Sequence, residues 1–228
     1  MKSIILTIVA GLLVGPSVAA AAVVAGQMDD FEDGTVQAWT GSFATPPGPP
    51  VNIATGGPAG AGDNYLQVTS TGGAGAGSKL ATFNPAQWSG DYIAAGVTAI
   101  QVDMKNFSVS GADLEMRLLI PFGGGGDFTS TLSQTVPADG AWHTLTFGLT
   151  AADLVQVGGV GSDLNTTLQG VPRILLRHQP GTPTGVGSSP AIAAQLGIDN
   201  VLAIPEPATA LLLGLGGLVL CKRRRRRV

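Results

Sequence analysis

Cysteine is almost absent from this chain. The one cysteine, Cys221, lies at the end of an apolar stretch close to the C-terminus. The remainder of the chain therefore has neither a disulfide nor a nucleophilic thiol. Its stability has to come from packing or from a bound ion.

Catalytic signals are also scarce. The two histidines are His143 and His178, and neither belongs to a metal-binding pair, a nucleophile elbow or a phosphate-binding loop. The glycine run at 123–126 lacks the Lys-Ser/Thr that such a loop requires. We therefore do not predict an enzyme, and a glycoside-active hydrolase with paired carboxylates is kept as a minor alternative.

Basic residues are few once the two ends of the chain are set aside. Residues 23–204 contain 14 acidic residues against five basic ones, and the other seven basic residues lie near the termini. An acidic domain repels nucleic acid and attracts cations. No nucleic-acid partner is expected.

The N-terminus has the order of a secretory signal. Lys2 precedes an apolar run from Ile4 to Val14, and small residues follow from Pro16 to Ala22. The run is shorter than the ~20 residues that cross a bilayer as a helix. We expect residues 1–22 to be a signal peptide that signal peptidase removes, with cleavage near Ala20 to Ala25.

The C-terminus has three parts. Pro205, Glu206 and Pro207 interrupt regular structure, and an apolar stretch of 14 residues follows from Ala208 to Cys221. As a helix this stretch is about 21 Å long, against a hydrocarbon core of roughly 30 Å, so it would need snorkelling side chains or a thinned bilayer. A basic run then ends the chain and is expected to remain cytoplasmic as a membrane stop signal, formed by Lys222, Arg223, Arg224, Arg225, Arg226 and Arg227.

These three parts together resemble the PEP-CTERM sorting tail, also described as the C-terminal domain of certain ice-binding proteins. The resemblance covers about residues 204–228, with Ile204 standing where valine is frequent. It implies recognition of the Pro-Glu-Pro segment by an exosortase, transient anchoring in the inner membrane, and sorting to the cell surface or extracellular matrix of a Gram-negative bacterium that makes exopolysaccharide. We expect residues 205–228 to form this tail.

The middle of the chain alternates apolar and polar residues with the period of a β-strand. Gly- and Pro-rich clusters separate the alternating segments and predict loops. Thr150 to Leu154 predicts a single helical turn. About ten strands are expected, at Met28–Phe31, Val51–Ala54, Leu66–Thr69, Lys79–Phe83, Ile100–Lys105, Leu114–Ile120, Phe128–Val136, Trp142–Leu149, Arg173–Gln179 and Leu196–Ile204.

Many short strands with few helices predict an all-β domain over residues 23–204, an antiparallel β-sandwich of the jelly-roll type. Three segments resemble parts of jelly-roll carbohydrate-binding modules: Asp30–Gly34 followed by Trp39, Gly140–Phe147, and Gly197–Val201. That resemblance implies that the first and last strands pair. It is an analogy at the level of the fold and does not identify a ligand.

A sugar-binding surface needs aromatic rings that stack on pyranose faces and planar polar groups that bond hydroxyls. Alternation directs several such side chains away from the core, and two aromatic residues lie in a loop-like segment. The alternative is that the sandwich buries its aromatic residues and is a structural envelope protein with no small ligand. The candidate glycan-binding residues are Trp88, Tyr92, Arg117, Trp142, Arg173, Arg177 and Gln179.

Pairing of the first and last strands would also bring acidic side chains together. Asp30, Glu32 and Asp199 are candidate ligands of a structural calcium ion, because calcium prefers hard oxygen donors. Alternatively they are solvated edge charges or turn caps. The leading hypothesis is an exported surface or matrix protein whose β-sandwich binds exopolysaccharide.

Overall fold

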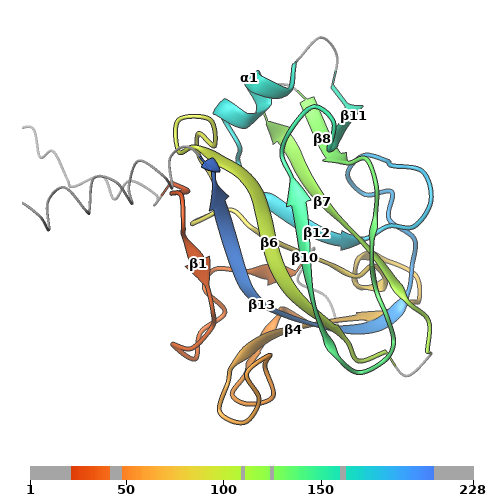
Figure 1. Ribbon diagram of the computed structural model, residues 1–228. Coiled ribbons are helices and arrows are strands. Elements are labelled where there is room, and N and C mark those ends of the chain that lie inside the picture. The colour runs from red at the N-terminus through yellow and green to blue at the C-terminus, as the bar shows by residue number, and fades with distance from the viewer. Residues whose placement is uncertain (1–21, 42–47, 109–110, 124–125, 160–162, 208–228) are drawn as a thin grey trace, which may run out of the picture.

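The computed structural model describes residues 22–41, 48–108, 111–123, 126–159 and 163–207. Two antiparallel sheets pack face to face in a β-sandwich, so the predicted all-β jelly-roll class is confirmed (Figure 1). Among these residues no helix is long and apolar enough to cross a membrane. Apart from Ala22, the predicted signal peptide lies outside the described residues, as do the apolar and basic parts of the predicted tail.

The first sheet faces the viewer in Figure 1 and has the order β10-β6-β13-β4-β3, with β1 added beside β13. The long strand β13 pairs with β4, β6 and β1 and is therefore the centre of this sheet. The six strands of the first sheet are β1 (Met28–Asp29), β3 (Val51–Ile53), β4 (Tyr65–Thr71), β6 (Val97–Asn106), β10 (Trp142–Gly148) and β13 (Ala193–Pro205).

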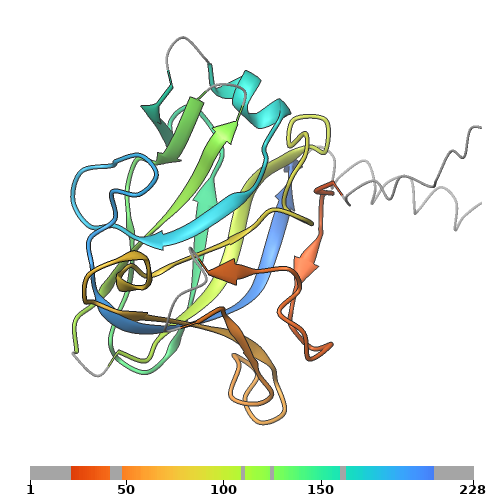
Figure 2. The same cartoon turned by 180° about the vertical axis from the view of Figure 1, so that it is seen from behind.

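The second sheet is seen from its outer side in Figure 2 and has the order β11-β8-β7-β12-β5-β2, with β9 beside β7. The two short helices are η1 (Ala76–Ser78) and α1 (Leu164–Gln169). The seven strands of the second sheet are β2 (Thr40–Gly41), β5 (Ala81–Asn84), β7 (Leu114–Gly123), β8 (Gly126–Ser130), β9 (Gln134–Val136), β11 (Leu154–Gly158) and β12 (Ile174–His178).

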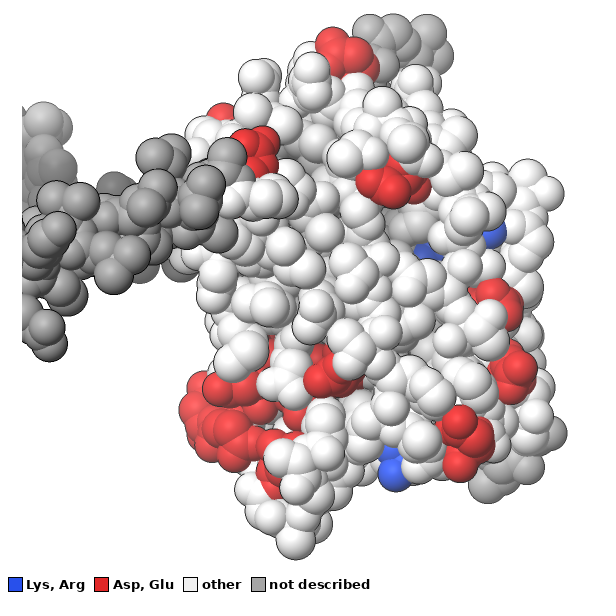
Figure 3. Space-filling view, in the orientation of Figure 1, with Lys and Arg blue, Asp and Glu red and all other residues white. Residues whose placement is uncertain are grey.

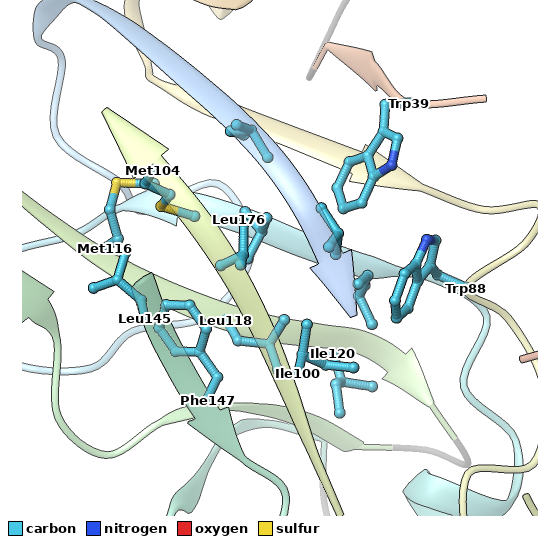
Figure 4. Close-up of a cluster of buried hydrophobic side chains, with 14 of the residues drawn as sticks. Trp39, Trp88, Ile100, Met104, Met116, Leu118, Ile120, Leu145, Phe147 and Leu176 are labelled. Atoms are coloured by element: carbon cyan, nitrogen blue, oxygen red, sulfur yellow. The ribbon is translucent and has the colours of Figure 1, made fainter. Parts of the chain in front are cut away.

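The core fills the space between the sheets, and the alternation in the sequence predicted which side chains enter it. Ile100, Val102 and Met104 on β6 are buried opposite Met116 and Leu118 on β7 (Figure 4). Each fully buried side chain of this kind contributes about 1.5–3 kcal/mol relative to an exposed one. Hydrophobic burial on one side of each strand therefore holds the sandwich together.

The first and last strands pair, as expected. In the register of β1 and β13, Met28 is opposite Leu202 and Asp29 is opposite Val201. β13 has a register shift between Asp199 and Leu202, within which Asn200 adopts a left-handed conformation. The ends of the described chain thus lie side by side at one end of the sandwich (Figures 1 and 2).

Some elements differ from the sequence prediction. The single strand expected over Phe128–Val136 is two strands, β8 and β9, which both pair with β7 and are separated by a bend at 131–132 that interrupts the pairing. β2, β11 and α1 were not predicted. The turn at 150–154 forms, with the Thr150 N–H and hydroxyl both donating to the Asp153 carboxylate, but it leads directly into β11.

A buried carboxylate joins β1 to two aromatic side chains of distant segments. The indole N–H groups of Trp39 and Trp88 donate to the same oxygen of Asp29, at 2.7 and 2.6 Å. Burial raises the pKa of Asp29, and the two indole bonds oppose that shift. Asp29 therefore fixes Trp39 and Trp88 inside the sandwich, where Figure 4 shows them side by side.

Candidate functional site

The outer face of the second sheet carries a groove of about 610 Å³. Strand alternation aims Phe83, Leu119 and Leu175 at this face, and register places them in one row across β5, β12 and β7. The 13 residues that line the groove are Gly41, Gly75, Ser78, Lys79, Ala81, Phe83, Leu119, Arg173, Leu175, Arg177, Val186, Gly187 and Ser189.

The floor of the groove is apolar. Leu119 and Leu175 are buried there, and the half-buried ring of Phe83 continues the same row toward the sheet edge. The guanidinium of Arg173 lies over this ring, with its carbon 4.5 Å from the ring centroid. An aromatic and aliphatic floor with polar groups beside it is the usual composition of a small-molecule pocket.

One wall of the groove is the loop between β12 and β13, and two arginines hold part of it. Arg117 donates to the carbonyl oxygens of Gln179, Gly181 and Ser130, at 3.0, 2.6 and 2.6 Å. Because each guanidinium nitrogen has a carbonyl partner, Arg117 acts as a structural clamp. Its side chain is 3% exposed, and burial lowers its pKa.

Arg177 holds the next part of this loop. Its guanidinium donates to the carbonyls of Gly185 and Thr184 and to the side-chain oxygen of Gln179. The Gln179 amide in turn donates to the Thr184 hydroxyl. These bonds bring the glycine- and proline-rich loop against the sheet and shape the groove.

One donor of Arg177 has no acceptor. Its side chain is 1% exposed, and Nε is buried without a hydrogen-bond partner. Burial and the neighbouring charge of Arg117 together lower the pKa of Arg177 to about 10, and Asp127 opposes both effects. An orphan donor at this depth costs free energy unless an acceptor reaches it.

Lys79 and two serines add polar groups at the rim. Lys79 donates to the carbonyl of Gly187 in the loop, and Ser78 and Ser189 are buried beside it. Lys79, Phe83, Leu119 and Leu175 were not among the site residues predicted from the sequence. Outward alternation within β5, β7 and β12 was the signal for them, but it does not reveal which outward residues meet beneath one loop.

The seven candidate glycan-binding residues do not all lie together. Arg173 and Arg177 line the groove, and Arg117 and Gln179 support its wall. Trp142 lies on the outer face of the first sheet, where its indole N–H donates to the Gly56 carbonyl at 3.1 Å. The structure thus brings together four of the seven.

Two exposure predictions are wrong. Trp88 and Tyr92 have exposed fractions of 0%, so neither ring is available for stacking on a sugar. Trp88 bonds Asp29, and the Tyr92 hydroxyl donates to the Trp88 carbonyl at 2.9 Å. Arg117, Arg177 and Gln179 do point outward as predicted, but the β12–β13 loop covers them.

The three candidate calcium ligands have other partners in the structure. Asp30 accepts hydrogen bonds from the Glu32 N–H and the Gln37 amide, and Glu32 accepts one from the Asn64 N–H. Asp199 is buried, and burial together with Asp63, Asp103 and Glu32 raises its pKa to about 7. Within the described ranges no group of three or more His, Cys, Asp or Glu side chains is arranged to hold a metal ion, so we derive no function from calcium.

The fold of the domain has relatives among solved structures. It is similar to part of an exo-β-agarase, with a TM-score of 0.54 and 16% identity, and the match covers 80% of this chain and 25% of that one. The chain thus spans a quarter of the agarase. A family 11 carbohydrate-binding module from Clostridium thermocellum has a TM-score of 0.47 and 21% identity, over 80% of this chain and 98% of the module. No curated protein matches the sequence.

The C-terminal segment gives the second comparison. In the structure Pro205 is the last residue of β13, opposite Val97, and the Glu206 N–H donates to the Gly96 carbonyl. Glu206 and Pro207 are exposed at the end of the strand. Residues 203–227 match the PEP-CTERM protein-sorting motif, and the chain therefore carries a sorting motif that implies exosortase-dependent export.

Proposed function

We propose that the exported domain is a glycan-binding module and that it uses the groove on the outer face of the second sheet. The observation that carries this proposal is the composition of the groove. Phe83, Leu119 and Leu175 form an apolar floor, and charged and hydroxyl groups stand at its margin. A sugar ring has apolar C–H faces and a rim of hydroxyls, so it matches such a surface on both counts.

The fold supports the same proposal to a limited extent. A domain of similar fold forms part of an exo-β-agarase, an enzyme whose name refers to a polysaccharide. The groove contains no histidine and no carboxylate among its lining residues. Binding without catalysis is therefore the role that these side chains support.

The test is a glycan pull-down with the exported full-length protein, comparing Phe83→Ala with Phe107→Ala. Both rings are half-buried on outer faces, but Phe107 lies on the first sheet beside Trp142. Loss of the Phe83 ring should weaken binding by about tenfold or more, since a stacked aromatic contributes of order 1 kcal/mol beyond its buried area. Absence of binding to any glycan would instead favour a structural envelope protein.

We further propose that the mature protein resides at the cell surface or in the extracellular matrix. Residues 1–22 would be the signal peptide, and the burial of Val23, whose N–H donates to the Ser89 carbonyl, supports cleavage before Val23. Signal peptidase and exosortase are the expected processing partners. Envelope fractionation of cells with and without the run at 222–227 tests the tail, and unchanged retention would contradict it.

A further inference from the structure

Basic side chains are distributed very unevenly over the domain. Of the five basic residues in 23–204, four belong to the outer face of the second sheet: Lys79, Arg117, Arg173 and Arg177. The fifth, Lys105, lies on the first sheet opposite Trp142. Figure 3 shows the outer side of the first sheet, where acidic groups outnumber basic ones. An acidic domain thus concentrates its positive charge around one groove.

The charged residues that line the groove are all of one sign, whereas the face around it also carries acidic residues. Three of its 13 lining residues are basic and none is acidic. Two acidic residues share the outer face: Glu115, which favours the charged form of Arg117, and Asp127, which favours that of Arg177. Neither lines the groove. A ligand in the groove therefore meets positive charge that the lining does not neutralise.

Each of the three basic lining residues is held in place by a contact of its own. Arg173 rests on Phe83 through the flat face of its guanidinium, Lys79 is tied to Gly187, and Arg177 is fixed by three acceptors. A guanidinium recognises planar anions through its N–H edge, and stacking on a ring uses its face. The cations are thus ordered before a ligand arrives, which lowers the entropy cost of binding.

Arg177 Nε is a separate observation that points to a ligand. This donor is buried at the groove with no hydrogen-bond partner, on a side chain that is 1% exposed. A hydrogen bond to a charged acceptor is worth about twice one to a neutral acceptor. An anionic oxygen is accordingly the acceptor that best compensates this donor.

We propose that the groove binds an anionic polysaccharide whose carboxylate or sulfate groups are recognised by Arg173, Lys79 and Arg177. This inference rests on the proposed glycan-binding function and adds the chemical class of the ligand. The half-buried Phe83 ring contacts a sugar face, Leu119 and Leu175 are buried beneath it in the floor, and the basic residues bond the charged substituents.

The test is a titration of the exported full-length protein with polygalacturonate, dextran sulfate and neutral agarose. It is run at roughly 0.01 and 0.15 M salt, where the Debye length is about 30 and 8 Å. The variants are Arg173→Gln and Lys79→Gln, with Lys105→Gln as the control that removes the same charge from the first sheet. Thermal melting of each variant verifies that it is folded.

We expect an acidic polymer to bind, with affinity that falls as salt rises. Arg173→Gln and Lys79→Gln should each weaken binding by about tenfold, the effect of losing one charge-assisted hydrogen bond, and Lys105→Gln should leave it unchanged. A preference for polygalacturonate identifies a uronate ligand, and a preference for dextran sulfate identifies a sulfated one. Either preference supports the proposal.

Two results would overturn the inference, and a third would overturn the function as well. Salt-independent binding of agarose that Phe83→Ala abolishes would keep the glycan-binding function and refute the anionic ligand. An equal loss with Lys105→Gln would show attraction to overall charge rather than to this groove. Absence of binding to all three polymers would refute both proposals.

Discussion

The two outer faces of the sandwich are built from the same alternation of residues, but one carries aromatic rings and acidic residues and the other carries an apolar groove. On the first sheet the rings of Phe107 and Trp142 lie across Gly197, and Asp103 and Asp199 face each other in register. On the second sheet a loop held by arginines rises above an apolar row. The difference shows that a loop, rather than the strand pattern, decides which face carries a groove.

The largest expected effect comes from breaking the loop clamp with Arg117→Met. The substitution keeps the length of the side chain but removes the donors of three carbonyls, in Gln179, Gly181 and Ser130. We expect a loss of about 3 kcal/mol in the free energy of unfolding, together with loss of glycan binding. Urea unfolding and the pull-down measure both effects.

The control for this change is Lys105→Met, which removes one cation from the first sheet and should alter stability by at most about 0.5 kcal/mol. Limited proteolysis gives an independent readout, because the freed segment from Gln179 to Ser189 should become cleavable. Unchanged binding in a folded Arg117→Met protein would show that the wall is not part of the site.

A second substitution, Asp199→Asn, acts on the first sheet and should have the opposite sign. The pKa of Asp199 is raised to about 7 from an ordinary value of 3.8, so the folded state binds this proton more tightly than the unfolded state. The associated stability is complete below about pH 3.8 and disappears as pH rises through 7. Asparagine is neutral at every pH and keeps an oxygen for the Asn200 N–H.

We therefore expect Asp199→Asn to stabilise the protein at pH 8 by a few kcal/mol at most, with a smaller gain at pH 5. Melting curves at the two pH values measure this, and Asp113→Asn is the matched control because Asp113 is an exposed carboxylate. A loss of stability at pH 8 would instead indicate that the charged form of Asp199 has a partner.

The smallest effect is expected from Gly197→Ala. This change alters the outer face of the first sheet only, so it tests whether glycan binding depends on that face. A Cβ at Gly197 would lie 2.8 Å from the Trp142 ring and 2.9 Å from the Phe107 ring, so both rings must shift. Overpacking of this kind costs about 1–3 kcal/mol, and the exposed side of these rings favours the lower end. The free energy of unfolding should fall while glycan binding stays unchanged. Weaker glycan binding would instead indicate that the site lies on the first sheet.

The sequence predicted those parts of the fold that depend on local pattern. Alternation in 100–104 and 114–120 identified the core side chains, and the resemblance of the two ends to paired strands was correct. The exposure of Trp88 could not be predicted, because its partner Asp29 is 59 residues away and is buried with it. Local composition indicates a loop there but not what the loop packs against.

The groove was only partly predictable for the same reason. Arg173 and Arg177 were selected by their outward parity, but Phe83 and Lys79 join them through strand order in the sheet, β5 beside β12. Strand order depends on contacts between distant segments, which one sequence does not reveal. The sorting motif could be read in full because it depends on the order of residues and not on folding.

The position of β13 has a consequence for the timing of folding. This strand is the centre of the first sheet, and among the described residues it is the last strand and ends at Pro205, the first residue of the Pro-Glu-Pro segment. A chain that crosses the membrane from its N-terminus delivers the central strand last, so β4, β6 and β1 have no common partner until then. If the chain is exported in this direction, as we propose, the first sheet would be completed only after the strand that adjoins the sorting motif has emerged.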